Sequence, residues 1–167
     1  TSLMAMMYGY HARGEWIDRR ATNAVDGGAP FYGAYRCSDG EFIALGAIEP
    51  QFYARMRDLF GLDGVDFDQQ WDVDLWPDLK ARIAHAVAQR SRAEWVALLG
   101  GTDACVAPVL SLQDAPADPH NLARDAFLMV EGVIQPAPAP RFSRTPGVIH
   151  SPPVRAGHGS REALLDW

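Results

Sequence analysis

Two short apolar runs in the first half of the chain have the pattern of paired β-strands. They are FYGAYRC (31–37) and EFIALGAI (41–48), and both are rich in aromatic and β-branched residues. Ser38-Asp39-Gly40 separates them, and an Asp-Gly pair between two such runs is typical of a tight hairpin turn. The pattern therefore predicts a β-hairpin over residues 31–48.

Apolar residues three or four positions apart predict three helices after the hairpin. Pro50 suits the first turn of a helix over residues 50–61, which Gly61 would end. A second helix is predicted over residues 76–90, and the capping box Ser91–Glu94 begins a third. The side chains expected to be buried in the first helix are Phe52, Met56, Leu59 and Phe60. In the second helix an apolar residue recurs every four positions, at Leu75, Leu79, Ile83 and Val87, and the third carries Trp95, Leu98 and Leu99.

Between and after these helices the sequence predicts shorter elements. Residues 62–73 are acidic and are expected to form a loop that Trp71 anchors. The apolar run ACVAPVL (104–110) predicts a buried strand. A further helix is expected near residues 118–126, because Asp118 suits its N-cap position.

Both ends of the chain are apolar in parts but have little core of their own. Residues 1–20 are rich in Met and aromatic residues at helical spacing, although Gly9 and Gly14 weaken the helix. After residue 131 prolines recur and predict an extended segment, which ends in a short helix over SREALLDW (160–167). Exposed apolar segments of this kind usually pack on a further part of a protein.

Composition and charge narrow the classes of function. The 167 residues are 48% apolar and 22% charged, which is ordinary for a soluble globular protein. A net charge of −6 without a basic face argues against nucleic-acid binding, and the lack of an apolar run of about 18 residues argues against a membrane span. Cys37 and Cys105 are too few for a disulfide scaffold and indicate reduced thiols in the cytoplasm. The five histidines show no metal-ligand spacing, so no metal site is expected.

Catalytic motifs such as GxSxG and HExxH are absent, and Glu49 is the carboxylate in the most informative place. It lies where the second strand of the hairpin ends and Pro50 begins a helix. The helix dipole favours a carboxylate there, and residue chemistry alone favours that simple interpretation. The alternative is a carboxylate that orients a catalytic imidazole from another part of the protein. The methionines of residues 4–7 likewise suit either core packing or a surface that adapts to a flexible acyl chain.

A longer segment resembles a known family. The stretch DGGAPFYGAYRCSDGEFIALGAIEPQFY (26–53) is similar to the corresponding stretch of the α-methylacyl-CoA racemases, which are members of the family III CoA-transferase superfamily. The resemblance covers nearly the whole chain, and GAIEPQF together with TDACV is typical of the racemase branch. Further matches are WPDLKARIA (76–84), AEW (93–95), GTDACVAPVL (101–110), HNLARDAF (120–127) and PAPRFSRTP (138–146).

The resemblance implies that the chain has an α+β fold and is the C-terminal portion of a longer protein. Members of the family have a large N-terminal Rossmann-type domain, a linker, a small α+β domain and a tail that returns to the large domain. In this chain the linker helix would cover residues 1–30, and the small α+β domain, a β-hairpin or short sheet with packed helices, residues 31–125. A second linker would follow over 126–140, and the tail over 141–167 would pack on the large domain.

The activity that the resemblance implies is inversion of the carbon next to a thioester. The racemases interconvert (R)- and (S)-2-methylacyl-CoA in fatty acid and lipid metabolism by moving a proton through an enolate, and acyl-CoA is a substrate rather than a cofactor. Their catalytic His and Asp belong to the N-terminal domain, so this chain alone is expected to be inactive. The expected partners are the acyl-CoA and a second copy in an interlocked cytoplasmic homodimer, with no metal, redox cofactor, nucleic acid or membrane.

The site residues implied by the resemblance lie in the hairpin and near the start of the chain. Glu49 matches the glutamate that hydrogen-bonds the catalytic His. Tyr32 and Ile48 match residues that line the acyl site. The region that corresponds to a Met-rich acyl-binding surface contains Met4, Met6 and Met7.

Two other functions remain open at this point. A CoA-transferase of the same superfamily moves CoA between carboxylic acids through a nucleophilic Asp, which would also lie outside this chain. The third hypothesis is a stand-alone interaction domain without catalytic activity.

Overall fold

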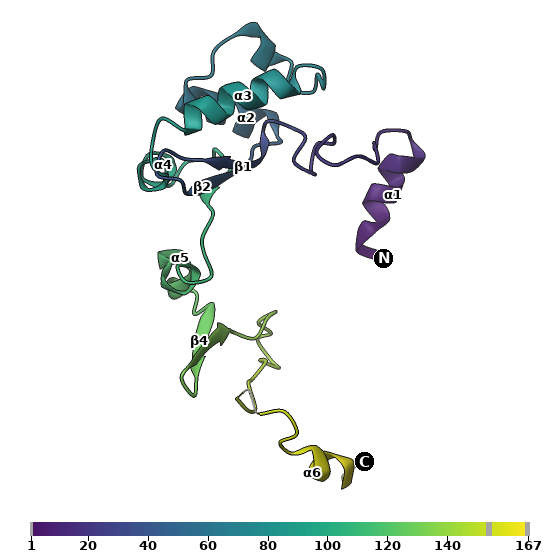
Figure 1. Ribbon diagram of the computed structural model, residues 1–167, viewed down its shortest axis with the longest axis vertical. Helices are drawn as coiled ribbons and strands as arrows, with labels where there is room; N and C mark the ends of the chain where they lie inside the picture. Colours follow the sequence, from purple (N-terminus) through teal and green to yellow (C-terminus); the bar gives the residue numbers. More distant parts are fainter. Residues whose placement is uncertain (1, 153–154, 166–167) are drawn as a thin grey trace. The chain divides into compact units, whose positions relative to one another are not determined.

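The computed structural model describes residues 2–152 and 155–165, and the chain divides between Val109 and Leu110 into two compact units. The first unit contains a three-stranded antiparallel sheet with helices, and the second a two-stranded hairpin with short helices (Figure 1). The predicted α+β class is therefore confirmed. The domain limits implied by the resemblance concern a longer protein and stay a prediction.

The first sheet is built on the predicted hairpin, which is confirmed. β1 (Tyr32–Arg36) and β2 (Phe42–Gly46) are antiparallel, with Tyr32 opposite Gly46. Gly40 in the connecting loop has a φ of +88°, a conformation that favours glycine. β3 (Val106–Pro108) pairs with the other side of β2 and completes the order β1-β2-β3.

All three predicted helices of the first unit are present. α2 (Pro50–Phe60) ends at Gly61, whose φ of +64° is left-handed. α3 (Trp76–Val87) ends slightly before the predicted limit. α4 (Arg92–Leu99) begins at the predicted capping box: the backbone N–H of Glu94 donates to the Ser91 hydroxyl, and the Ser91 N–H donates to the Glu94 carboxylate at 2.8 Å.

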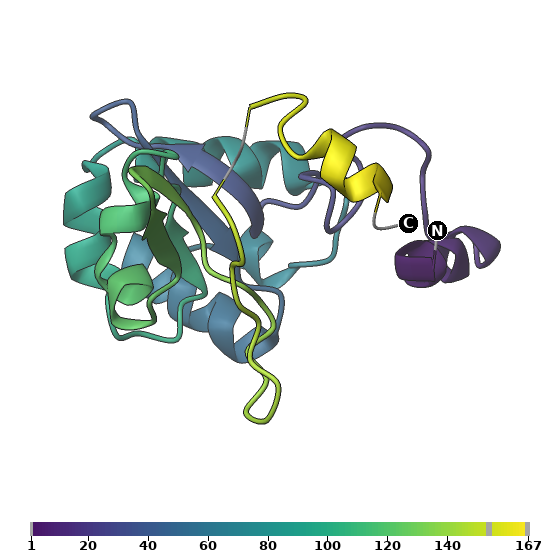
Figure 2. The same ribbon diagram turned by 90° about the horizontal axis from the view of Figure 1, so that it is seen from below.

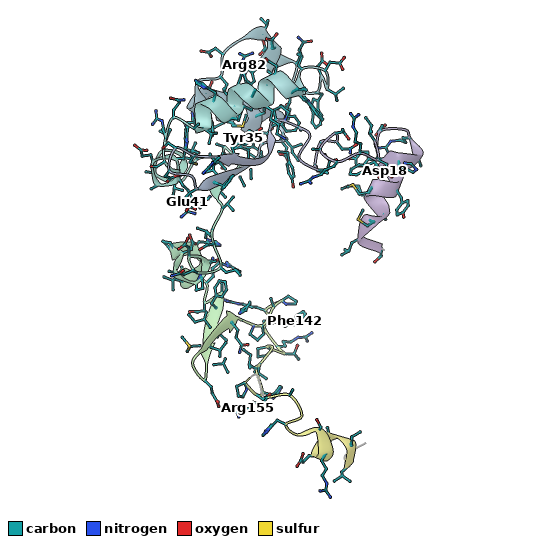
Figure 3. The ribbon with its side chains drawn as sticks, in the orientation of Figure 1. Asp18, Tyr35, Glu41, Arg82, Phe142 and Arg155 are labelled. Atoms are coloured by element: carbon teal, nitrogen blue, oxygen red, sulfur yellow. The ribbon has the colours of Figure 1, made fainter. Side chains whose placement is uncertain are left out.

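The core of the first unit lies between the sheet and the helices that cover it (Figures 1 and 2). Phe31 is fully buried there. Its ring meets three other rings edge-on, those of Tyr53, Trp71 and Trp76, at centroid distances of 5.8, 5.1 and 6.1 Å. Tyr35 on β1, labelled in Figure 3, is buried in the same core. Aromatic pairs of this kind contribute about 0.5–1.5 kcal/mol each beyond the area they bury.

The buried face of α2 differs in detail from the prediction. Its buried side chains are Tyr53, Met56 and Phe60, whereas the predicted Phe52 and Leu59 are half-buried. Positions three and four residues apart share one face of a helix, and Tyr53 completes that spacing.

The loop between α2 and α3 is anchored mainly by Phe67, whereas the predicted anchor Trp71 contacts the Phe31 ring at a centroid distance of 5.1 Å but is not buried. Phe67, in the 3₁₀ turn η2 (Val65–Asp68), is fully buried, whereas Trp71 is 56% exposed. The guanidinium groups of Arg57 and Arg82 lie over the Phe67 ring at 5.7 and 4.5 Å. These cations come from the two flanking helices, so the sequence of the loop itself does not reveal them.

The prediction of a buried strand over residues 104–110 is wrong. The run 104–110 forms a three-residue edge strand, in which Val106 is half-buried and Ala107 is exposed. On α4, Leu98 is 38% exposed, whereas Trp95 and Leu99 are buried. Trp95 and Leu99, four residues apart, share the buried face of α4.

The helix at the start of the chain is short. η1 (Ser2–Met4) leads into α1 (Ala5–Ala12), and no residue from 5 to 12 is buried. Gly14 follows with a φ of +72°, and the chain then runs irregularly to β1. Within residues 1–30 the helix is therefore limited to the first half, because the glycines and the Asp26-Gly27-Gly28 turn interrupt it.

The second unit contains a hairpin that the sequence analysis did not predict. β4 (Phe127–Val130) and β5 (Val133–Pro136) are antiparallel. Glu131 and Gly132 between them have φ angles of +47° and +83°, as a two-residue turn of type I′ requires. Residues 133–136 are extended, as predicted after residue 131, but the sequence analysis did not predict that they pair with β4.

Short helices precede and follow this hairpin in the sequence. After η3 (Ala115–Ala117), α5 (Pro119–Ala123) is capped as predicted by Asp118, whose carboxylate accepts the backbone N–H of His120 at 3.0 Å. α6 (Ser160–Leu165) confirms the helix expected near the end of the chain, and the last two residues of SREALLDW lie outside the described part.

We expect Ser91→Ala to lower the free energy of unfolding of the first unit by about 1 kcal/mol, because α4 loses its N-cap. Urea denaturation followed by tryptophan fluorescence measures this change. The control is Ser38→Ala, at an exposed serine of the hairpin loop, which should change the free energy of unfolding by less than about 0.5 kcal/mol. Equal losses in the two variants would contradict the role of the capping box.

Candidate functional site

Glu49 lies at the junction between β2 and α2 and is exposed. Its backbone is extended, with φ −71° and ψ 143°, and its carbonyl accepts the N–H of Tyr53 at 2.9 Å in the first turn of α2. Its carboxylate makes no hydrogen bond to the helix end that it precedes. The side chain therefore does not serve as a helix cap, and it is open to a group from elsewhere.

The segment before Glu49 is held by hydrogen bonds from two distant parts of the chain. The backbone N–H of Ala47 donates to the carbonyl of Phe31 at 3.1 Å. The side-chain amide of Gln70 donates to the carbonyl of Ile48 at 2.8 Å. The sequence analysis did not single out Gln70, because no local signal marks a contact across 22 residues.

An apolar cavity of about 480 Å³ opens beside Ile48. This volume is within the range of small-molecule sites, which are mostly apolar with a few polar groups. Met6 and Ile48 are the two predicted site residues in its wall. Trp71, Trp76 and side chains of residues 15–25 form much of the remaining lining.

One wall of this cavity is the 17–28 loop, which its own side chains hold together. Asn23 is buried, and its amide donates to the carbonyl of Ile17 at 2.9 Å and to the carboxylate of Asp26 at 2.7 Å. The Asp26 carboxylate also accepts the backbone N–H groups of Asn23 and Gly28, at 2.8 and 3.1 Å. Burial alone would raise the pKa of Asp26, but these donors together lower it.

The other predicted lining residues lie elsewhere in the first unit. Met4 and Met7 line a second hollow of about 360 Å³ beside α1, together with Asp18 (Figure 3). Tyr32 on β1 is 36% exposed and lines neither hollow. The structure thus places two of the predicted acyl-site residues in one cavity, Met6 and Ile48.

Neither cysteine is activated as a nucleophile. Burial raises the pKa of the Cys37 thiol. Cys105 is exposed, but partial desolvation of its sulfur, followed by the charges of Glu49 and Asp103, raises its pKa as well. Both thiols are therefore protonated at neutral pH, where the thiolate is the reactive form. The negative charge of Glu49 is thus one of the causes that raise the pKa of Cys105.

The exposed carboxylate of Glu49 thus follows directly after Ile48, a residue that lines the apolar cavity. Within residues 2–152 and 155–165, no three side chains of His, Cys, Asp or Glu gather closely enough to hold a metal ion. In the same part of the chain no helix has the length and apolar character needed to cross a membrane.

Comparison with known proteins identifies the family of this chain. The family model described as CoA-transferase family III matches residues 1–158. The α-methylacyl-CoA racemase of Mus musculus is 42% identical over 147 residues, which cover 87% of this chain and 39% of that protein. The racemase of Homo sapiens is 42% identical over 134 residues, which cover 80% of this chain and 35% of that protein. The chain therefore spans less than half the length of these relatives.

A solved structure shows the same fold. The crystal structure of a CAIB/BAIF family protein from Brucella suis matches with a TM-score of 0.69 at 19% sequence identity. The match covers 99% of this chain and 44% of that one. At this level of identity the likeness concerns the fold alone.

We expect acid to weaken the 17–28 loop through Asp26. Its pKa is lowered in the folded chain and is about 4 in an unfolded chain. The ionised carboxylate therefore stabilises the fold above a pH of about 4, and this contribution is lost as the pH falls through the lowered folded value. Asp26→Asn should remove that part of the pH dependence of the free energy of unfolding, measured by urea denaturation from neutral to strongly acidic pH.

The matched control for this experiment is Asp58→Asn, at an exposed aspartate of α2. If Asp26→Asn loses as much stability in acid as the unchanged protein does, the hydrogen bonds to Asp26 do not stabilise the loop in the way described.

Proposed function

The chain belongs to CoA-transferase family III, and on that premise we propose that the protein containing it is an α-methylacyl-CoA racemase. The observation that carries the proposal is the 42% identity to the mouse and human racemases over most of this chain. Because the chain corresponds to 39% and 35% of those proteins, the activity belongs to the whole protein, of which this chain forms the C-terminal part.

The reaction inverts the carbon next to the thioester of a 2-methylacyl-CoA. The α-proton is weakly acidic, so a base must remove it from one face and an acid must return a proton to the other. The enolate oxygen formed between these steps needs stabilisation. In the racemases that the chain resembles, a His and an Asp of the N-terminal domain act as base and acid. We propose that a His and an Asp outside this chain have the same roles in this protein.

We propose that Glu49 orients the catalytic imidazole. A carboxylate that accepts the imidazole N–H fixes the tautomer and stabilises the imidazolium after proton transfer. The exposed position of Glu49 and its freedom from helix capping support this role. The first interpretation of the sequence, a carboxylate placed for the helix dipole, does not conflict with it, since the dipole acts without a hydrogen bond.

The cavity beside Ile48 is proposed to receive the branched acyl chain. Its apolar lining suits an alkyl or aryl group, because each buried methylene contributes about 0.8 kcal/mol. Met6 lets the wall adapt to chains of different shape. We extend the role of acyl-site residues to Tyr32, Met4 and Met7, which the resemblance to the racemases supports.

The remaining features of the proposal concern the whole protein. We propose a cytoplasmic homodimer that acts in fatty acid and lipid metabolism. The reaction moves a proton and no electrons, so it requires no redox cofactor. The substrate supplies the CoA group, and the acyl chain occupies the cavity.

A CoA-transferase is the second candidate, because the family model that matches the chain is named for that activity. A transferase moves CoA to a second carboxylic acid through a covalent intermediate. A racemase needs no second acid, and it exchanges the α-proton with solvent. Product analysis therefore separates the two activities.

We expect the whole protein to convert a single enantiomer of a 2-methylacyl-CoA into a mixture of both. In D₂O one deuterium should enter at the α-carbon, as chiral chromatography and mass spectrometry would show. Addition of a free carboxylic acid should yield no new CoA ester. The chain of residues 1–167 by itself should be inactive, because the acid and base lie outside it. Formation of a new ester without inversion would establish the transferase instead.

We expect Glu49→Gln in the whole protein to lower kcat for inversion about 10- to 100-fold, the usual effect of losing a carboxylate that orients a catalytic group. The amide keeps the size of the side chain but loses the charge that stabilises the imidazolium. Steady-state kinetics with the 2-methylacyl-CoA measure this effect. Glu131→Gln, at an exposed glutamate of the β4–β5 turn, is the matched control and should leave kcat unchanged. An unchanged kcat in Glu49→Gln would remove Glu49 from the mechanism.

A further inference from the structure

Gln70 is a buried polar side chain in the loop between η2 and α3. It is 8% exposed, and Asn23 is the other buried polar residue within the described part of the chain. Burying an amide is unfavourable unless its hydrogen bonds are made inside the protein. The partners of Gln70 therefore indicate what the side chain is for.

The Gln70 amide donates to two carbonyls directly ahead of Glu49. It reaches the carbonyl of Ile48 at 2.8 Å and that of Ala47 at 3.4 Å. Both carbonyls lie beyond the end of β2 at Gly46 and before α2. Neither the strand ladder nor the helix supplies a donor there, so the amide takes the place of a backbone partner.

Gln70 is itself held in place by α3. The indole N–H of Trp76, the first residue of α3, donates to the backbone carbonyl of Gln70 at 3.0 Å. Trp76 is 6% exposed, so this bond is shielded from water. Hydrogen bonds thus connect α3 through Gln70 to Ile48, and Glu49 is the next residue.

We propose that Gln70 is a positioning residue for Glu49. Its amide fixes the two peptide groups that precede Glu49 and so sets the direction in which the carboxylate leaves the strand-to-helix junction. The inference rests on the proposed function, in which this carboxylate orients a catalytic imidazole. A displacement of about 1 Å in such a group costs on the order of 100-fold in rate, so the junction requires a rigid support.

Two variants of the whole protein separate positioning from general stability. Gln70→Met keeps a side chain of similar length but removes the donor, and we expect kcat to fall about tenfold or more. Gln70→Glu keeps the shape but presents a carboxylate, which accepts hydrogen bonds and cannot donate to the two carbonyls. Burial raises the pKa of such a carboxyl, and its protonated form is a donor again. The ratio of kcat in Gln70→Glu to kcat in the unchanged protein should therefore rise as the pH falls.

A double-mutant cycle tests whether Gln70 acts through Glu49. In the Glu49→Gln background, Gln70→Met should lower kcat by less than about twofold, because coupled residues are not additive. A side chain with a merely structural role would lower kcat by the same factor in both backgrounds. Gln89→Met is the matched control, since the exposed Gln89 amide donates to the carbonyl of His85 at 3.0 Å, far from the junction in sequence. It should leave kcat unchanged.

The outcomes are distinguishable. Equal factors in the two backgrounds, or a Gln70→Glu ratio that does not change with pH, would overturn the positioning role and leave the proposed function intact. If Gln70→Met does not fold, as judged by thermal unfolding, the pH series of Gln70→Glu decides. Absence of inversion by the unchanged protein would overturn the proposed function. An unchanged kcat in Glu49→Gln would remove Glu49 from the mechanism, and either result would also overturn this inference.

Discussion

The burial of one aromatic ring, that of Phe31, is the interaction on which the first unit depends. Phe31 lies where the irregular start of the chain becomes β1, and its ring touches Tyr53 of α2, Trp71 of the following loop and Trp76 of α3. Its carbonyl also accepts the N–H of Ala47, just beyond the end of β2. A single residue therefore joins the hairpin, two helices and a loop, and the candidate site forms where these segments meet. Burial of aromatic side chains stabilises the packing of these segments but does little to fix the orientation of individual groups.

The backbone groups of the candidate site are oriented by hydrogen bonds, which depend strongly on angle and distance. Gln70 ties the peptide groups before Glu49 to the loop, and Trp76 ties that loop to α3. On the other side of the cavity, Asn23 and Asp26 close the 17–28 loop in the same manner. The first unit thus combines an aromatic core with a few polar side chains, of which Gln70 and Asn23 bond to the lining residues Ile48 and Ile17.

The sequence predicts those features whose determining contacts are local. The cap of α4 spans three residues from Ser91 to Glu94, and the end of α2 depends on one glycine, Gly61, so both can be recognised from a few letters. The place of Glu49 between strand and helix is predictable for the same reason. The anchoring of Phe67 and the support from Gln70 depend on partners far along the chain, and no local pattern encodes them. The β4–β5 hairpin was missed because its Glu131–Gly132 turn lacks the usual Asn-Gly or Asp-Gly signal and prolines follow it.

The 17–28 loop makes most of its hydrogen bonds within its own stretch of sequence. The bonds of Asn23 reach Ile17 and Asp26, six and three residues away, so closing the loop costs little chain entropy. The contact of the Lys80 ammonium with the Gly27 carbonyl spans 53 residues and forms only once α3 has docked. One wall of the cavity is therefore held mainly by local hydrogen bonds, with one long-range contact from α3. A ligand that enters the cavity meets a surface that is already ordered, and its binding free energy is not consumed in ordering the protein.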